Sequence, residues 1–149
     1  MITERDEFFM RRALDEARKA FSEDEVPVGA VIVRNGEIIA SAHNTRESDK
    51  NALHHAEIKV IDASCKALGG WRLVGCTLYV TLEPCPMCAG AIINSRVERV
   101  VYGASDKKAG SFGTMLDLTA YPLYKPEVEG GVLSDECSAI LSDFFKAKR

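Results

Sequence analysis

The sequence predicts an α/β domain in which helices cover both faces of a mixed β-sheet. Three observations lead to this prediction. An Asn-Gly turn at residues 35–36 joins two apolar runs, which is typical of an antiparallel hairpin. Later apolar runs alternate with helical patterns, which favours parallel strands because helices connect them. The chain has 149 residues, enough for one domain with a real core, so we expect a single domain over residues 1–149.

The first half of the chain predicts a helix, a hairpin and a second helix. Apolar residues recur at helical spacing over residues 3–21, which indicates an amphipathic helix. Residues 28–33 and 37–42 are the two expected strands of the hairpin. The helical pattern over residues 55–68 ends at two consecutive glycines, which commonly terminate helices.

The second half adds three strands and two helices. Residues 76–82 form a dense apolar run that predicts a buried strand, and residues 86–95 predict a short helix after it. Residues 99–103 are the next expected strand, and 127–133 can hold a short last one. We expect Ser134 to cap a terminal helix.

Composition restricts the class of protein. At 46% hydrophobic and 28% charged residues, the chain is typical of globular domains. Five cysteines without a disulfide-type spacing favour a reducing compartment. The acidic N-terminus does not resemble a signal peptide, and no apolar run approaches the roughly 20 residues of a membrane span. We therefore expect a cytoplasmic protein. The net charge of −3 argues mildly against nucleic-acid binding, although Lys107 and Lys108 are adjacent in a loop.

Two short motifs carry candidate metal ligands. One contains His55 and Glu57, and the other is a Pro-Cys-x-x-Cys segment with Cys85 and Cys88. The two sulfurs can project the same way, because residues three apart share a helix face. His55 begins another expected helix, so the two helix N-termini can meet beyond the ends of neighbouring strands. The pattern predicts a zinc site with His55, Cys85 and Cys88 as ligands.

Glu57 distinguishes a catalytic site from a structural one. Three protein ligands leave the fourth position of zinc for water, as in many catalytic sites. Glu57 lies two residues after His55, so the two side chains do not share a helix face. We therefore assign Glu57 to proton transfer at that water and not to the metal. A Cys-x-x-Cys pair alone would equally fit a redox pair or a structural zinc, but a structural site has no use for Glu57.

The chain resembles the bacterial tRNA-specific adenosine deaminases of the cytidine deaminase-like superfamily. The zinc motifs above are shared by the whole superfamily. The resemblance extends over nearly the whole length, and its later blocks point to the tRNA branch. The blocks that carry it lie at residues 25–31, 44, 55–58, 78–91, 95–97, 101–104, 106, 108, 110, 136–137 and 144–145.

The resemblance implies a three-layer α/β/α sandwich with a mixed five-stranded sheet, one zinc ion per chain and a homodimer. It implies conversion of the wobble adenosine of a tRNA anticodon loop to inosine, with release of ammonia. The implied partner is the anticodon stem-loop, with no DNA and no membrane. The implied substrate contacts come from Val28, Asn44, Ala56, Asp106 and Phe145.

Some features depart from the family pattern and keep alternatives open. Residues 51–54 replace the commoner acidic-Pro-Thr-Ala approach to the ligand histidine. The first alternative is a deaminase of a free base or nucleoside, such as guanine or cytosine, which would use the same metal site. The second is a non-enzymatic, zinc-stabilised RNA-binding module, which Glu57 argues against.

Overall fold

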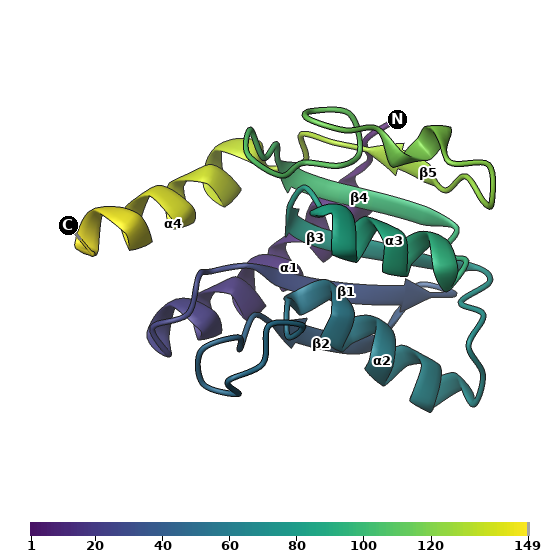
Figure 1. The fold of residues 1–149 in the computed structure, drawn as a ribbon, viewed down its shortest axis with the longest axis horizontal. Coiled ribbons are helices and arrows are strands. Elements are labelled where there is room, and N and C mark those ends of the chain that lie inside the picture. The colour runs from purple at the N-terminus through teal and green to yellow at the C-terminus, as the bar shows by residue number, and fades with distance from the viewer. Residues whose placement is uncertain (149) are drawn as a thin grey trace.

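The computed structural model describes residues 1–148, and Arg149, the last residue of the predicted domain, lies outside them. Within residues 1–148, five strands form one sheet in the order β2-β1-β3-β4-β5, with four α-helices around it (Figure 1). The strands are β1 (Gly29–Arg34), β2 (Glu37–His43), β3 (Cys76–Leu82), β4 (Arg99–Ala104) and β5 (Glu127–Glu129). The helices are α1 (Glu4–Ser22), α2 (Ala56–Leu68), α3 (Pro86–Asn94) and α4 (Ser134–Ala147). No helix among these residues is both long and apolar enough to cross a membrane.

The strand pairing confirms a mixed sheet with the hairpin first and parallel strands later. Strand β1 runs antiparallel to both β2 and β3, while β3 is parallel to β4 and β4 to β5. Asn35 and Gly36 have positive φ angles of 53° and 77°, as the predicted two-residue turn requires. The long connection from β4 to β5 contains only the short 3-10 helix η1 (Leu118–Ala120), so no α-helix joins these parallel strands.

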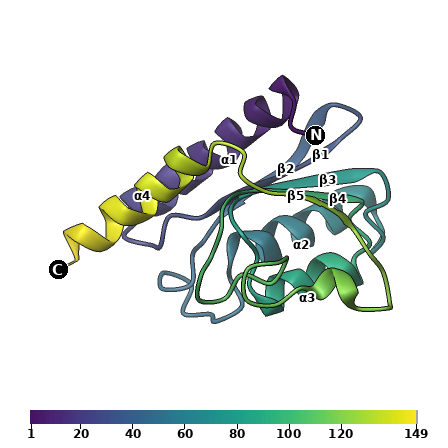
Figure 2. The ribbon, with the colours of Figure 1, turned by 90° about the horizontal axis from the view of Figure 1, so that it is seen from above.

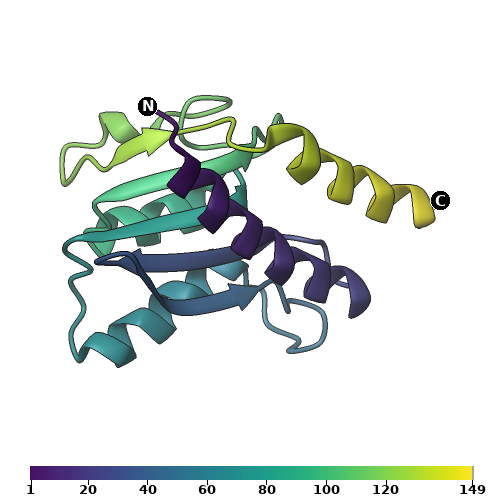
Figure 3. The ribbon, with the colours of Figure 1, turned by 180° about the vertical axis from the view of Figure 1, so that it is seen from behind.

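The helices form two layers, which confirms the three-layer α/β/α sandwich. Helices α1 and α4 lie on one side of the sheet and α2 and α3 on the other (Figure 2). Figure 3 shows the α1 and α4 face directly. These helices lie so close to the sheet that glycine is needed. A Cβ on Gly29 would be 2.1 Å from the carbonyl oxygen of Ala13, and one on Gly103 would be 2.3 Å from Sγ of Cys137.

The N-terminus of α1 is tied to the sheet by a buried carboxylate. Thr3 caps the helix and forms a capping box with Asp6. The Asp6 carboxylate also accepts hydrogen bonds from both terminal nitrogens of Arg99, at 2.7 and 3.0 Å, and from the hydroxyl of Tyr79, at 2.8 Å. Arg99 is the first residue of β4, so this cluster marks the end of the sheet where β3 and β4 begin.

The predicted cap at Ser134 is wrong, because Ser134 is already helical. The cap position belongs to Leu133, which has a left-handed conformation with φ of 53° and no side-chain cap bond. Leu133 packs against the core between α1 and the sheet, and its neighbour Val132 is buried there. Core packing, and not a capping hydroxyl, therefore sets the start of α4. Further along α4, Phe144 is buried against Phe21, with ring centroids 5.8 Å apart.

Candidate metal centre

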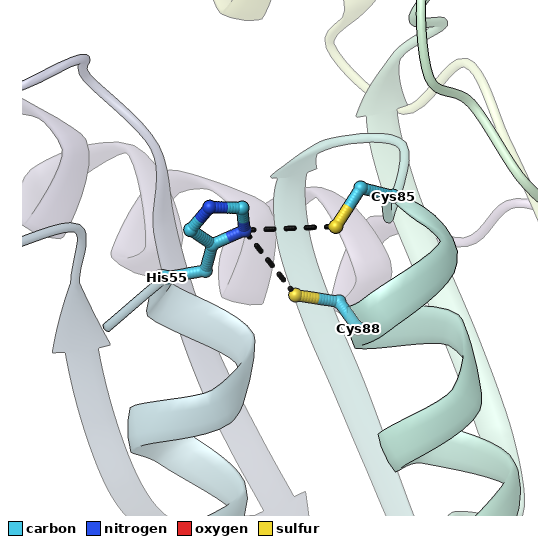
Figure 4. Close-up of side chains that lie close together, drawn as sticks. All are labelled: His55, Cys85 and Cys88. Carbon is cyan, nitrogen blue, oxygen red and sulfur yellow. Dashed lines mark hydrogen bonds between the residues drawn. The ribbon is translucent and has the colours of Figure 1, made fainter. Parts of the chain in front are cut away.

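Two helix N-termini meet beside the sheet and bring the metal-binding motifs together. His55 is the N-cap of α2, and Cys85 is the N-cap of α3. Cys88 lies in the first turn of α3, where Pro86 occupies an early position that suits its missing N–H. The three side chains point toward one another from the two helix starts (Figure 4). The predicted meeting of the two motifs is confirmed.

The spacing of the three side chains fits a tetrahedral zinc ion. Nδ1 of His55 lies 3.6 Å from Sγ of Cys85 and 3.6 Å from Sγ of Cys88. Zinc bonds of about 2.1 Å to nitrogen and about 2.3 Å to sulfur at tetrahedral angles place these atoms about 3.6 Å apart. Within residues 1–148, these three side chains are the only group of histidine, cysteine and acidic residues close enough to share an ion. Thiolate and imidazole are ligands that zinc prefers.

The two cysteines are electrostatically unlike in this arrangement. The hydrogen bond from the Cys88 thiol, together with that to His55, lowers the pKa of Cys85 to about 4. The same bond to Cys85, together with burial, raises the pKa of Cys88. The bond to Cys85 also raises the pKa of His55. The site is thus polarised toward a thiolate at Cys85, the form that binds metal, and a divalent cation would favour the second thiolate.

Glu57 is buried beside this group, with 4% of its surface exposed. Burial raises its pKa to about 7, partly offset by its own backbone N–H. A carboxyl group with a pKa near neutrality is suited to take up and return protons, and a bound cation would lower that pKa. Glu57 does not belong to the group that could share the ion. This position agrees with the interpretation that Glu57 acts beside the metal and not on it.

A cavity of about 210 Å³ opens in front of these side chains. It is smaller than the roughly 300–1,000 Å³ of drug-sized pockets, so its size suits one nucleobase. His55, Glu57 and Cys85 line it, whereas Cys88 is fully buried behind. The predicted substrate-binding residues that also line it are Val28, Asn44, Ala56 and Asp106.

Two polar side chains in this cavity are oriented by their own loops. The amide nitrogen of Asn44 donates to the Val26 carbonyl oxygen at 3.2 Å, and its oxygen accepts from the Arg46 N–H at 3.2 Å. Oδ1 of Asp106 accepts from the N–H groups of Lys108 and Ala109 at 2.9 and 3.3 Å. Within the described chain, these bonds use one amide hydrogen of Asn44 and one oxygen of Asp106. The remaining hydrogen and oxygen are left for a ligand.

Two aromatic side chains lie outside this group. Phe145 does not line the cavity. Its side chain is on α4, 46% exposed, with its ring 5.4 Å from that of Phe144. Its substrate contact therefore stays a prediction. His54 turns away from the metal site, because its Nδ1 lies 2.7 Å from Asp49 and its Nε2 lies 3.2 Å from the Asn51 amide.

Sequence reasoning missed several residues of the cavity wall, above all Arg46 and Glu83. Arg46 is exposed on the loop after β2, and Glu83 is buried directly after β3. A signal for Glu83 was present, because a charged residue between a buried strand and Pro84 needs partners. Nothing in the local pattern says which residues those partners are.

Comparison with known proteins agrees with this geometry. The family model of MafB19-like deaminases matches residues 4–149. A tRNA-specific adenosine deaminase of Bacillus subtilis is 56% identical over 97% of this chain and 91% of its own length. A solved structure from a study of A-to-I editing by tRNA:A34 deaminases at the wobble position is 45% identical, with a TM-score of 0.87 over 90% of this chain and 99% of its own. Guanine deaminase from Nitrosomonas europaea is 25% identical, with a TM-score of 0.81 over 97% of this chain and 85% of its own.

Proposed function

The chain belongs to the tRNA-specific adenosine deaminases, and we infer that it hydrolyses the wobble adenosine of a tRNA anticodon loop to inosine and ammonia. The resemblance seen in the sequence is thereby confirmed. A loop adenosine suits the small cavity, because an unpaired base can be splayed out of its stack at little cost. The cytoplasmic location stays a prediction.

We propose that His55, Cys85 and Cys88 hold one zinc ion. When bound there, zinc supplies Lewis acidity that lowers the pKa of a water molecule toward neutrality. The spacing of the three ligand atoms and the soft donor set support zinc over magnesium or calcium, which prefer oxygen ligands. Three protein ligands would leave one coordination position of the ion open to water.

We propose that Glu57 moves the protons of the reaction. It takes a proton from the attacking water as the bond from oxygen to C6 of adenine forms, and it delivers that proton to N1. It then passes the second proton of the water to the amino group, the C6–N bond breaks, and ammonia leaves. The oxygen stays on C6 as the carbonyl of inosine, so one water is consumed for each ammonia. The observation that carries this proposal is the buried Glu57 facing the same cavity as His55 and Cys85.

A substrate panel tests this function. The protein is incubated with an anticodon stem-loop that carries a wobble adenosine, and with free adenosine, cytidine and guanine, while ammonia release is followed. A matched stem-loop with cytidine at the wobble position is the control. We expect ammonia only from the adenosine stem-loop. Faster release from free guanine or cytidine would contradict the proposal and favour the free-base alternative.

We propose that Lys107 and Lys108 contact the phosphates of the stem-loop. Both are exposed and directly follow Asp106 of the cavity wall. Changing both to Glu should weaken stem-loop binding and flatten its dependence on salt, because each lost phosphate contact lowers the slope. Lys66→Glu on α2 is a matched control, since Lys66 is exposed but pairs with Asp62. Phe145→Ala tests the predicted contact from α4 in the same assay.

We propose that the protein is a homodimer that buries the exposed side of α3. A hollow of about 410 Å³ lies there between α3 and the connection that contains η1, and it is lined by Ile93, Tyr121 and Leu123. Tyr121 and Leu123 are about half exposed, and such apolar patches usually mark interfaces. Leu123→Glu should yield a monomer in sedimentation experiments. Phe8→Glu, on the opposite helical layer, should leave the dimer intact.

A further inference from the structure

Glu83 is a buried carboxylate placed two residues before the metal ligand Cys85, and 1% of its surface is exposed. Its oxygens accept hydrogen bonds from the N–H groups of Asp106 at 3.2 Å, Phe112 at 3.0 Å and Thr114 at 3.2 Å. The hydroxyl of Thr114 also donates to it. All four donors come from one stretch of the loop after β4.

These four bonds match the acceptor capacity of the group. An ionised carboxylate offers about four lone-pair sites, and no amide or alcohol of the same size can accept all four bonds. A buried carboxylate without such donors would be costly, and so would the buried N–H of Phe112 without an acceptor. The loop and Glu83 therefore depend on each other.

Backbone bonds tighten the same junction. The Glu83 N–H donates to the carbonyl oxygen of Ala104 at 2.8 Å, and the Ser111 N–H donates to that of Pro84 at 2.9 Å. The next residue after Pro84 is Cys85. The segment Glu83–Cys85 thus carries a proposed metal ligand and is also bonded to the loop that places Asp106 in the cavity wall.

Gly110 shows how closely this loop approaches the carboxylate. A Cβ at Gly110 would lie 2.5 Å from Oε1 of Glu83 and 2.5 Å from the carbonyl oxygen of Asp106. Any side chain there would push the loop off the carboxylate. The glycine is required by close approach and not by a positive φ angle.

We propose that Glu83 is a positioning residue that fixes the wall formed by residues 104–114, and with it Asp106, at a set distance from the metal centre. This inference rests on the proposed function. Glu83 then determines how tightly the substrate nucleotide is held and takes no part in the proton transfers. Glu57 and Glu83 have different roles. Glu57 lines the cavity beside the metal site, whereas the oxygens of Glu83 accept hydrogen bonds from the loop.

Glu83→Gln tests this role without changing the size of the side chain. The amide NH2 would face N–H donors, so part of the loop would lose its anchor. We expect faster hydrogen exchange at Asp106, Phe112 and Thr114, an unchanged zinc content, and a loss of roughly 10- to 100-fold in kcat/KM on the stem-loop. Most of that loss should be in KM, which a merely structural role would leave unchanged in the folded protein.

Two further variants test the same contact from the loop side if Glu83→Gln fails to fold. Gly110→Ala presses on the carboxylate from the loop side, and Thr114→Val removes one of the four bonds. Both should shift exchange and KM in the same direction, with Thr114→Val the weaker. Asp6→Asn is the matched control. It alters an equally buried carboxylate at the other end of the sheet, and should lower the melting temperature without changing loop exchange or KM.

Three outcomes would overturn the proposal: unchanged loop exchange in Glu83→Gln and Gly110→Ala, a loss confined to kcat, or a loss of zinc. Hydrogen exchange needs no substrate. If the wild-type protein did not act on the stem-loop, the proposed function would fail, while exchange in the variants would still decide whether Glu83 holds the loop.

Discussion

Glu57 and Asp6 are both almost fully buried, at 4% and 2% exposed. Their pKa values nevertheless shift in opposite directions from the usual value of a carboxyl group. Burial raises the pKa of Glu57 to about 7. Burial also acts to raise the pKa of Asp6, but hydrogen bonds from Arg99, Tyr79 and Thr3 outweigh it and lower that pKa to about 2. The two groups lie at opposite ends of the parallel strands, because Arg99 begins β4 and the Pro-Cys motif follows β3.

The comparison teaches that, at similar burial, the hydrogen-bond and ionic partners of a carboxylate decide the direction in which its pKa shifts. Asp6 is surrounded by donors and a cation, so its charge is fixed and ties α1 to the sheet. Glu57 forms no ion pair with a side chain of residues 1–148, so its protonation can change, as the proposed proton transfer requires. Glu83 is a third case, where four donors from one loop make the carboxylate an anchor. The following changes should separate these roles.

The largest effect should come from removing a metal ligand. Cys85→Ser should lose zinc and all measurable ammonia release, because the remaining two ligands cannot hold the ion in its open geometry. The Asp6 end of the molecule should stay folded. Zinc content and activity are measured together, with Cys65→Ser as the control, since Cys65 lies outside the metal group. Full activity without zinc would contradict the metal-dependent account.

The next largest effect should come from Glu57→Gln. We expect kcat to fall by about 10²–10⁴-fold, the usual contribution of carboxylate proton transfer, with zinc retained. Thermal stability should be unchanged or slightly higher, because a buried carboxyl is replaced by an amide of the same shape. If the variant lost its metal, or kept more than about a tenth of the rate, Glu57 would not be the proton carrier.

Asp6→Asn should have the opposite effect to Glu57→Gln, with a loss of stability and an unchanged kcat. It leaves the Arg99 guanidinium with only Glu127, an exposed carboxylate 3.8 Å away, and breaking a buried pair typically costs about 3 kcal/mol of unfolding free energy. The kcat should be unchanged at temperatures where the variant is folded. Urea unfolding and stem-loop kinetics check the two halves of this prediction. A drop in kcat without a loss of stability would show that the two ends are not independent.

The smallest effect concerns acid stability. The pKa of Asp6 is about 2 in the folded protein, against 3.8 for an unperturbed aspartate, so the ionised form stabilises the fold by about 2 kcal/mol above pH 4. This contribution is lost as the pH falls from about 4 toward 2, since the folded pKa is the lower one. The stability gap between wild type and Asp6→Asn should therefore narrow over that window in urea unfolding. A gap that stayed constant would contradict the lowered pKa.

What the sequence predicted correctly is encoded within a few residues. The Asn35-Gly36 turn and the starts of α2 and α3, where His55 and Cys85 are the N-caps, each depend on local geometry. The rest depends on which distant segments meet. Glu83 finds its partners 23 to 31 residues later.

Other long-range contacts had no local signal either. His43 is held between Glu16 and Glu23 of the preceding helix region, at 3.1 and 2.9 Å. Leu133 takes the cap position of α4 because the core holds its side chain, although Ser134 is the better local candidate. Tertiary packing decided these details, and single-segment patterns do not contain it.

The most direct test of hydrolysis at the wobble position uses water enriched in heavy oxygen. The anticodon stem-loop is incubated with the protein in this water, digested, and its nucleosides are identified by mass spectrometry. The account predicts inosine at the wobble position, with the heavy oxygen on C6 and one ammonia released for each inosine. An unchanged wobble adenosine, or inosine without the heavy oxygen, would contradict it.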